Sequence, residues 1–369
     1  MHRRIEAREA AGIAAAVVSG GDVVESCYGM LDVERGAPVQ PDSVMRIYSM
    51  TKPVIAVAVM LLRERGLLNL HDPVREWIPS FGDLHMITEE PLDTDITVRH
   101  LLTHTAGLAN WFEEGAADDA CREANLVSPV LLLNNSLPTT VELISRLPLA
   151  FQPGTRWHYS TSFEVLGYLI ELISERSLGE FLREEIFTPL GMVDTGFSVL
   201  ATALDRFGPL YGPLEDGVVP ILDPKIGSPF TDIPVAPSGG GGLVSTLRDY
   251  LRFARMLGAG GTLDGVRILQ PESVRAMAAN QLHGSAFPIR WDDGPDDSTG
   301  YGLGLGVGVG EPVKFGWGGA AGSQMWVLPD HDLIVLAMTQ SMFDFTVSNA
   351  FVEGIITSGL GLDAPRPQF

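Results

Sequence analysis

The chain has 369 residues, which is long enough to bury at least one sizeable core and to divide into two or three domains. Its 46 acidic and 25 basic residues give a formal charge of −21, which disfavours nucleic acid or an anionic membrane as a general partner. Hydrophobic residues make up 45% and charged residues 19%, as is typical of an ordered globular protein. Three of the 25 basic residues are lysines, Lys52, Lys225 and Lys314, so a lysine within a chemical motif is less expected by chance.

No segment has the pattern of a membrane span or of a secretion signal. The longest apolar run, residues 54–62, is shorter than the ~20 residues that a membrane-spanning helix needs. Arg3 and Arg4 precede a second apolar run, but charged residues separate them from it and no convincing cleavage site follows. Cys27 and Cys121 are too few for a disulfide framework and lack the clustering of a zinc site. We therefore expect a cytoplasmic protein without a membrane partner.

The predicted elements begin with two short strands, residues 14–19 and 22–28, which Gly20 and Gly21 join as a hairpin. A helix follows from Ser49 to residue 65. Further helical spacing occurs at residues 97–104, 139–147, 162–176, 178–186 and 247–257. Strands are predicted at residues 301–309, 312–317, 324–328 and 333–339. Since the strands lie near the two termini around a mostly helical middle, we expect an α+β fold with one sheet assembled from both ends.

Two conspicuous patterns are interpreted as structural. The glycine-alternating run 302–308 lacks the spacing of a nucleotide-binding loop, so we expect a glycine-rich strand packed closely against a helix. Asp292, Asp293, Asp296 and Asp297 lack the order and the closing Glu of a calcium-binding loop, so we expect a solvated loop.

Ser49 and Lys52 form an S-x-x-K element at the predicted start of a helix. Positions three apart share one helical face, so the lysine amine can reach the serine hydroxyl and exchange a proton with it. An amine in water is protonated at neutral pH, so this role requires burial or a neighbouring cation. Free N–H groups at a helix start can also receive an oxyanion. Taken alone, the tetrapeptide also fits a capped helix with a solvated lysine.

Two further elements fit the same chemistry. Tyr159 lies at a predicted loop-to-helix junction, where it can act as a general base or proton relay if a cation stabilises its phenolate. Trp317, Gly318, Gly319 and Ala320 end a predicted strand, where glycines let backbone N–H groups approach a substrate carbonyl. Taken alone, the first element fits a buried structural tyrosine and the second a turn.

In this order the three elements resemble the serine β-lactamase and penicillin-binding-protein superfamily, which carries S-x-x-K, then Y-x-N, then K-T-G or replacements of them. They are most similar to class C β-lactamase-like carboxylesterases, the family VIII esterases, in which W-x-G or W-G-G takes the third position. Supporting segments lie at residues 46–53, 101–108, 152–157, 189–192 and 241–246, so the resemblance spans about residues 12–345.

The resemblance implies a β-lactamase/transpeptidase-like fold, with an antiparallel sheet flanked by helices. We expect a discontinuous sheet domain of residues 1–75 and 220–369, a mostly helical domain of residues 76–219, and an active site at their interface.

The resemblance also implies residue roles. Ser49 would be the acylated nucleophile, Lys52 its proton partner, and Tyr159 the base or relay that protonates the leaving alcohol. The N–H groups of Ser49 and Ala320 would form the oxyanion hole. The expected substrate contacts are Trp317, Gly318, Gly319 and Thr161. Candidate pocket walls are the aromatic residues Tyr48, Trp111, Phe112, Phe230 and Tyr301.

Two departures from the lactamase pattern favour the esterase branch. Thr161 stands where the pattern often has Asn, and Trp317 replaces a lysine that would pair with a β-lactam carboxylate. Lys314, Phe315 and Gly316 offer a second register, K-x-G, three residues earlier. We prefer the W-G-G register because Phe315 has no hydroxyl to match the usual Thr and because the following Ala-Ala-Gly resembles the esterases.

Other chemistries fit less well. His100 and His104 stand four apart on a predicted helix, but no HExxH motif accompanies them, so we expect no metal and no cofactor. No serine has glycine at both −2 and +2, so the nucleophile elbow of an α/β-hydrolase is absent.

The expected function is hydrolysis of neutral, short-acyl carboxylic esters by a serine hydrolase through an acyl-enzyme, with a small-molecule ester as partner. Three alternatives stay open: a transacylase or amide synthase using the same acyl-enzyme, a β-lactamase or D-amino-acid peptidase, and a catalytically silent scaffold or acylated sensor. The sequence does not indicate the oligomeric state.

Overall fold

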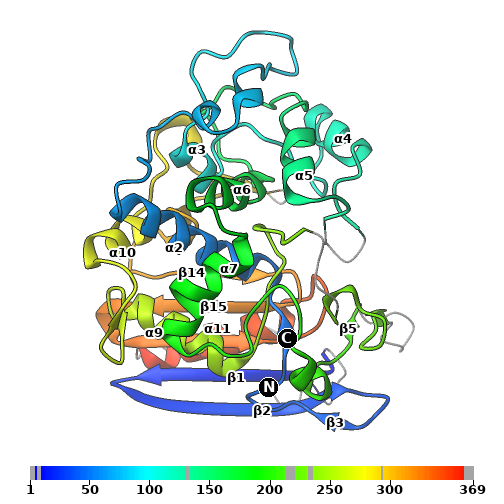
Figure 1. Ribbon diagram of the computed structural model, residues 1–369. Coiled ribbons are helices and arrows are strands. Elements are labelled where there is room, and N and C mark those ends of the chain that lie inside the picture. Colours follow the sequence, from blue (N-terminus) through cyan, green and yellow to red (C-terminus); the bar gives the residue numbers. More distant parts are fainter. Residues whose placement is uncertain are drawn as a thin grey trace.

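A computed structural model describes residue 5 and residues 10–128, 133–212, 221–231, 236–291 and 294–360. Within them the main sheet has the strand order β12-β13-β14-β15-β16-β1-β2-β3, with every neighbouring pair antiparallel (Figure 1). Its strands are β1 (Gly12–Ser19), β2 (Asp22–Asp32), β3 (Ala37–Pro38), β12 (Thr299–Tyr301), β13 (Gly306–Gly308), β14 (Phe315–Gly319), β15 (Ser323–Leu328) and β16 (Leu333–Met338). Because β1 pairs with β16, the two ends of the chain share one sheet, which confirms the predicted fold class.

The remaining strands form short pairs away from the main sheet. They are β4 (Met45–Arg46) with β7 (Val244–Ser245), β5 (Leu210–Tyr211) with β6 (Ile221–Asp223), β8 (Thr262–Leu263) with β9 (Val266–Arg267), and β10 (Ile289–Trp291) with β11 (Gly294–Asp296). Short 3₁₀ turns connect the elements: η1 (Tyr48–Met50), η2 (Val74–Glu76), η3 (Pro79–Gly82), η5 (Ala201–Arg206), η6 (Pro229–Thr231), η7 (Gly284–Ala286) and η8 (Pro329–His331).

The helices surround one central helix, α2 (Thr51–Glu64), which lies between the sheet and the helices at the top of Figure 1. The helices from the middle of the chain are α3 (Val98–Leu102), α4 (Ala116–Glu123), α5 (Leu137–Ile144), α6 (Ser162–Ser174), α7 (Leu178–Leu182) with the π-helical turn η4 (Arg183–Phe187), and α8 (Thr188–Leu190). The later helices are α9 (Leu247–Gly258), α10 (Pro271–Ala278) and α11 (Thr346–Gly359). The sequence pattern did not predict the helices α4, α10 and α11.

Helices cover both faces of the sheet centre, and the side chains of β16 show this directly. Leu333 and Val335 enter a hydrophobic cluster with α11, whereas Ile334 and Leu336 enter the main core with α2 and α9. Successive side chains of a strand point to opposite faces, so a strand covered on both sides is apolar throughout. All six residues of β16 are accordingly buried.

The central helix α2 is buried on all sides from Thr51 to Leu62. A helix that is apolar all round belongs in a core rather than at a surface. Its position matters for the site because the turn η1, which holds Ser49, leads directly into it.

The glycine-rich run departs from the prediction of one strand. It forms a hairpin of β12 and β13, in which Gly302 N–H donates to Leu305 C=O (2.7 Å). At its turn Gly304 has a φ of +78°, and a Cβ there would lie 2.4 Å from the Cβ of Ala56 in α2. The predicted close contact with a helix therefore occurs at the turn, where L side chains are disfavoured.

The acidic cluster agrees only in part with the predicted solvated loop: Asp297 is exposed in the bend between β11 and β12, whereas Asp296 is not in a loop. Asp292 and Asp293 lie outside the described residues. Asp296 belongs to β11, and its carboxylate accepts hydrogen bonds from the Ser298 N–H (2.9 Å) and the Thr299 N–H (3.2 Å). Burial raises the pKa of Asp296, but hydrogen bonds from the side chains and the backbone of Ser298 and Thr299 outweigh burial and lower it.

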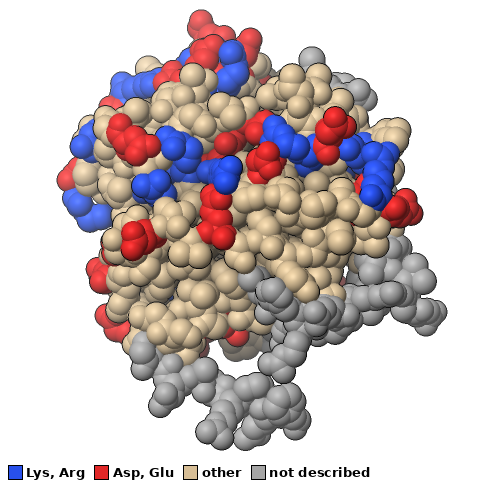
Figure 2. All heavy atoms as spheres, turned by 90° about the horizontal axis from the view of Figure 1, so that it is seen from below, with Lys and Arg blue, Asp and Glu red and all other residues tan. Residues whose placement is uncertain are grey.

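Seen from below, the molecule carries acidic and basic side chains mixed in one band, beside a broad area with neither (Figure 2). Among the described residues in this view there is no continuous basic patch of the kind that binds a nucleic-acid backbone. Across the described ranges, no helix is both long and apolar enough to span a bilayer. The division into residues 1–75 with 220–369 and residues 76–219 stays a prediction.

Candidate active site

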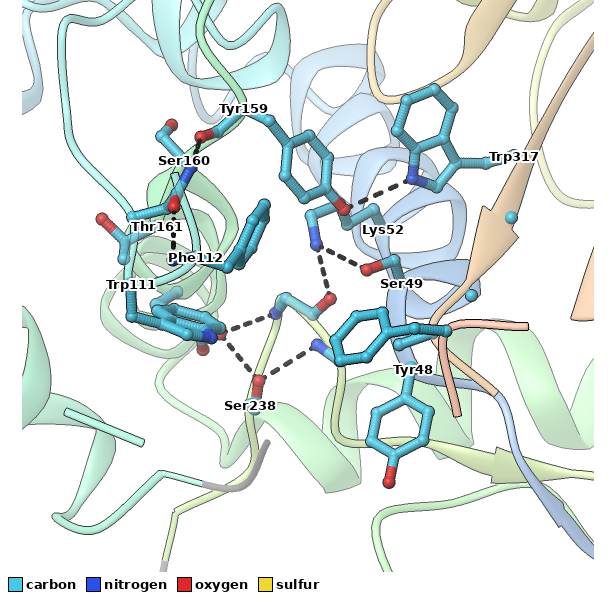
Figure 3. Close-up of a pocket in the computed structure, with 18 of the residues that line it drawn as sticks. Tyr48, Ser49, Lys52, Trp111, Phe112, Tyr159, Ser160, Thr161, Ser238 and Trp317 are labelled. Carbon is cyan, nitrogen blue, oxygen red and sulfur yellow. Dashed lines mark hydrogen bonds between the residues drawn. The ribbon is translucent and has the colours of Figure 1, made fainter. Parts of the chain in front are cut away.

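Ser49 lies on the turn η1, and Lys52 lies in the first turn of α2. The Lys52 Nζ donates a hydrogen bond to Ser49 Oγ (3.2 Å) and a second one to the Gly240 carbonyl (2.7 Å), as Figure 3 shows. Tyr48, the residue before the serine, has a φ of +42°, in the left-handed region that L side chains rarely adopt. Such strain recurs at functional sites, and here it precedes the serine that faces the lysine.

Tyr159 and Trp317 complete the group around this pair. The Lys52 Nζ lies 4.6 Å from the centroid of the Tyr159 ring, and the Trp317 Nε1–H donates to the Tyr159 hydroxyl (3.4 Å). Figure 3 shows the Tyr159 hydroxyl directed towards the lysine and the serine. The structure thus brings together Ser49, Lys52, Tyr159 and Trp317 from η1, α2, the loop before α6, and β14.

The end of β14 packs against the turn that holds Ser49. A Cβ on Gly319 would lie 2.1 Å from the carbonyl oxygen of Ile47, so no other residue fits there without a backbone shift. Ala320 follows directly, and its carbonyl accepts the Phe343 N–H (2.6 Å). The segment that carries Ala320 is therefore held against the turn that carries Ser49.

These residues open into a cavity of about 420 Å³. Gly318, Gly319, Ala320 and Thr161 line it together with the proposed catalytic residues. Its aromatic lining consists of Tyr48, Trp111, Phe112, Tyr159, Trp317, Trp326, Phe343 and Phe345. A mostly apolar pocket with a few convergent polar groups is typical of a small-molecule site.

Two of the predicted pocket walls are wrong: Phe230 and Tyr301 lie behind the cavity wall. Phe230 is 1% exposed, and its ring contacts the Tyr48 ring edge-on at 6.3 Å. Tyr301 is fully buried and packs edge-on against Trp317 at 5.0 Å. Both support wall residues from behind, because their strand or turn directs the ring into the core.

Thr161 and Lys314 bear on the departures from the lactamase pattern. The Thr161 hydroxyl lines the cavity but donates to the Ala109 carbonyl (3.2 Å). The Lys314 Nζ lies over the Trp326 ring, 4.9 Å from its centroid, and Lys314 does not line the described cavity. Trp317 does line it, which supports the W-G-G register.

A charged histidine anchors the loop that carries Trp111 and Phe112. His158 Nδ1 lies 3.0 Å from Glu113, and its Nε2 lies 3.0 Å from Asp118. Burial opposes the charge on His158, but the hydrogen bonds to Asp118 and Glu113 outweigh burial and raise its pKa to about 9. The segment next to Tyr159 is thereby tied to the aromatic wall by an ion triad.

Asn110 makes a second connection between this loop and Tyr159. Its side-chain N–H₂ donates to the Tyr159 carbonyl (2.5 Å), and its side-chain oxygen accepts the N–H groups of Phe112 and Glu113 (2.8 Å each). The Asn110 N–H in turn donates to Asp118 (3.0 Å). Every polar group of this buried side chain therefore serves to fix the loop.

A buried ion pair between Arg46 and Asp223 lies beside the segment that leads to Ser49. Arg46, three residues before Ser49, is fully buried, and its Nε donates to Asp223 (2.7 Å). Burial lowers the pKa of Arg46, and Asp223 opposes this effect. The guanidinium also lies over the Phe207 ring at 4.2 Å.

The two histidines considered for a metal have other partners. His100 helps to cap α3, since its Nδ1 accepts the Thr97 N–H (3.3 Å). His104 is fully buried, its Nδ1 accepts the Ser160 N–H (3.2 Å), and its ring lies 4.5 Å from the Tyr159 ring. Burial lowers the pKa of His104 well below its usual value, so the ring is neutral. In the part of the chain that the structure describes, no three His, Cys, Asp or Glu side chains group as metal ligands.

Sequence reasoning missed several residues of the site. Asn110, Glu164, Ser238 and Gly240 line the cavity, and Asn110 gives no signal in the sequence. Glu164 does give one, as an acidic residue on the apolar face of a predicted helix. Gly240 lies in the four-glycine run 239–242, which indicates a backbone that approaches another element closely.

Comparison with known proteins identifies the family of this chain. The model of the Beta-lactamase family matches residues 1–352. Protein Rv1367c of Mycobacterium tuberculosis is 34% identical over 376 residues, which cover 92% of this chain and 88% of the relative. Esterase EstB of Burkholderia gladioli is 30% identical over 362 residues, which cover 91% of this chain and 88% of the relative.

A solved structure gives the same result for the fold. EstCE1, described as a hydrolase with promiscuous acyltransferase activity, matches with a TM-score of 0.79 and 25% identity, over 93% of this chain and 92% of its own. Since the family match extends over nearly the whole chain, the protein belongs to the Beta-lactamase family, within the serine β-lactamase and penicillin-binding-protein superfamily that its motifs resemble.

Proposed function

We propose that this protein is a serine hydrolase of neutral, short-acyl carboxylic esters, of the EC 3.1.1 type, which forms an acyl-enzyme on Ser49. The observation that carries the proposal is the convergence of Ser49, Lys52, Tyr159 and Trp317 at one end of an aromatic cavity. A hydroxyl becomes a nucleophile when a positioned group takes its proton, and this arrangement supplies two such groups.

The steps follow from the positions of the groups. Tyr159, stabilised by Lys52, takes the Ser49 proton as Oγ attacks the ester carbonyl. The N–H groups of Ser49 and Ala320 stabilise the oxyanion, each donor contributing about 3 kcal/mol in the transition state. The proton then passes to the leaving alcohol, and the acyl group remains on Ser49. A water molecule repeats the sequence and releases the acid.

The preference for neutral esters rests on the charges in the cavity. Among the described residues that line it, Lys52 is the one cation, and it is occupied by Ser49 and Gly240. Trp317 stands where the lactamase pattern has a lysine, and its indole N–H points to Tyr159. A carboxylate on the substrate would therefore lose its hydration without gaining a cationic partner.

The test is turnover of p-nitrophenyl acetate together with labelling by a fluorophosphonate probe. We expect the wild type to turn over the ester and to be labelled, and Ser49→Ala to lose at least about 10³-fold in kcat and all labelling. Ser358→Ala, at an exposed serine of α11, is the matched control and keeps both. Turnover that survives unchanged in Ser49→Ala would contradict the proposal.

A second candidate is acyl transfer from the same intermediate to an alcohol or amine. The description of EstCE1 as a hydrolase with promiscuous acyltransferase activity favours it. Adding an alcohol acceptor during ester turnover separates the two functions, because a transferase forms a new ester while a pure hydrolase releases only the acid.

A further inference from the structure

Glu164 is a buried acid that the mechanism above does not use. It lies in the first turn of α6, lines the cavity and is 2% exposed. Its carboxylate accepts hydrogen bonds from Ser238 Oγ (2.7 Å), the Gly239 N–H (2.9 Å) and the Gly240 N–H (3.1 Å). A buried acid with several specific partners beside a cavity is a candidate for a role in the site.

All of these partners are donors. The two backbone groups can only donate, and the Ser238 hydroxyl accepts the Gly241 N–H (3.0 Å), so its own proton is directed to Glu164. Burial outweighs the opposing effects of Ser238, Lys52 and the two glycine N–H groups and raises the pKa of Glu164 above its usual value, so the ionised form is assigned from the geometry of its partners. An environment of donors alone suits the ionised carboxylate.

Gly240 links this carboxylate to Lys52 through its two backbone polar groups. Its N–H donates to Glu164, and its carbonyl accepts the Lys52 Nζ (2.7 Å). A Cβ at Gly240 would lie 2.5 Å from Glu164 Oε1 and 3.6 Å from Lys52 Nζ. The carboxylate and the ammonium are therefore at most about 6 Å apart, a range at which charges in a protein interact appreciably.

We propose that Glu164 is a positioning residue for the proton-transfer group. It holds the loop 238–241 so that the Gly240 carbonyl directs the Lys52 ammonium at Ser49, and its negative charge stabilises the cationic form of Lys52. This inference rests on the proposed function, in which the cation stabilises the Tyr159 phenolate. Glu164 acts through the loop, which it holds by three hydrogen bonds, and through its field at Lys52.

The test compares Glu164→Gln with Glu171→Gln on p-nitrophenyl acetate across pH. Glu171 is the matched control: it lies on the same helix, is half-buried, and accepts the Leu178 N–H (2.8 Å) away from the cavity. We expect Glu164→Gln to lower kcat about 30-fold or more and to change KM less than about threefold, because positioning for proton transfer is lost while substrate contacts remain. Glu171→Gln keeps the wild-type kcat.

The pH profile separates positioning from a purely structural role. Removing a negative charge favours proton loss from every nearby group, so both limbs of the kcat profile of Glu164→Gln move to lower pH by about one unit. Glu164→Asp restores the charge and returns the limbs towards their wild-type positions. A kcat within about twofold of the wild type with unmoved limbs, or an equal loss in Glu171→Gln, would overturn the inference.

Two further variants keep the test decisive if Glu164→Gln does not fold, as judged by circular dichroism and thermal melting. Ser238→Ala removes one donor and leaves the carboxylate, so we expect a fall in kcat of about 3- to 10-fold with KM unchanged. A wild-type kcat in Ser238→Ala would refute the inference, because the loop would then not depend on its bond to Glu164. Full turnover in Ser49→Ala would refute the proposed function, whereas an inactive Ser49→Ala beside a fully active Glu164→Gln would refute this inference alone.

Discussion

The ion triad of His158, Glu113 and Asp118 predicts a specific dependence of stability on pH, which His158→Gln exposes. The raised pKa of about 9, against an ordinary value of 6.5, means that the folded state favours the charged ring. The difference corresponds to about 3 kcal/mol of stability. Because the pKa is raised on folding, this contribution is complete below about pH 6.5 and is lost as the pH rises through about 9.

The assay is urea unfolding of the wild type and His158→Gln at pH 6, 8 and 10. The difference in unfolding free energy between the wild type and His158→Gln should be about 3 kcal/mol at pH 6. It should fall close to zero at pH 10, where the wild-type ring is also neutral. His331→Gln, at an exposed histidine of η8, is the control and should change stability by less than about 0.5 kcal/mol at each pH. An equal loss in His158→Gln at all three pH values would refute the assignment of a charged histidine.

The same titration should affect the site. The triad fixes the loop that carries Trp111 and Phe112, so we expect KM for p-nitrophenyl acetate to rise above about pH 9 in the wild type. In His158→Gln the KM should be raised already at pH 7 and should change little up to pH 10. A KM that is independent of pH in both proteins would show that the loop does not depend on the charge.

Three further predictions concern the other supports of the site. Gly319→Ala places a Cβ 2.1 Å from a backbone carbonyl, so kcat should fall at least about 10-fold and the melting temperature should drop; a variant equal to the wild type would contradict the close contact. Arg46→Met leaves the Asp223 carboxylate buried without its cationic partner, so the free energy of unfolding in urea should fall by about 3–5 kcal/mol. The double variant Arg46→Met with Asp223→Leu should restore part of this loss. Lys314→Ala should keep the turnover of nitrocefin and of the ester within about twofold of the wild type. Trp317→Ala should lower the ester turnover at least about 10-fold. A large selective loss in Lys314→Ala would favour the K-x-G register.

The parts of the fold that the sequence predicted are those that local patterns determine. The hairpin of β1 and β2 follows from two apolar strands joined by Gly20 and Gly21, and α2 follows from a long apolar block between Pro53 and Gly66. The glycine-rich run was predicted as one strand because Leu303, Leu305 and Val307 alternate as in a strand. The chain instead reverses direction at Gly304, where it contacts Ala56 of α2, a helix that is remote in the sequence.

The candidate site shows the same limit. Ser49, Lys52, Tyr159 and Trp317 belong to local motifs, so their convergence could be predicted from a resemblance. Phe230 and Tyr301 could not be separated from true wall residues, because an aromatic side chain does not reveal which side of a wall it occupies. The pairing of Glu164 with the loop 238–241 joins segments more than 70 residues apart, and only the folded chain shows it.

The central claim is that Ser49 carries the acyl group during turnover. The direct measurement is mass spectrometry of the intact protein quenched in acid during turnover of p-nitrophenyl acetate, followed by peptide mapping. We predict a mass increase of one acetyl group on the peptide that contains Ser49, absent in Ser49→Ala and present in Ser358→Ala. Ester turnover without any acyl adduct on that peptide, or with the adduct on another residue, would contradict the account.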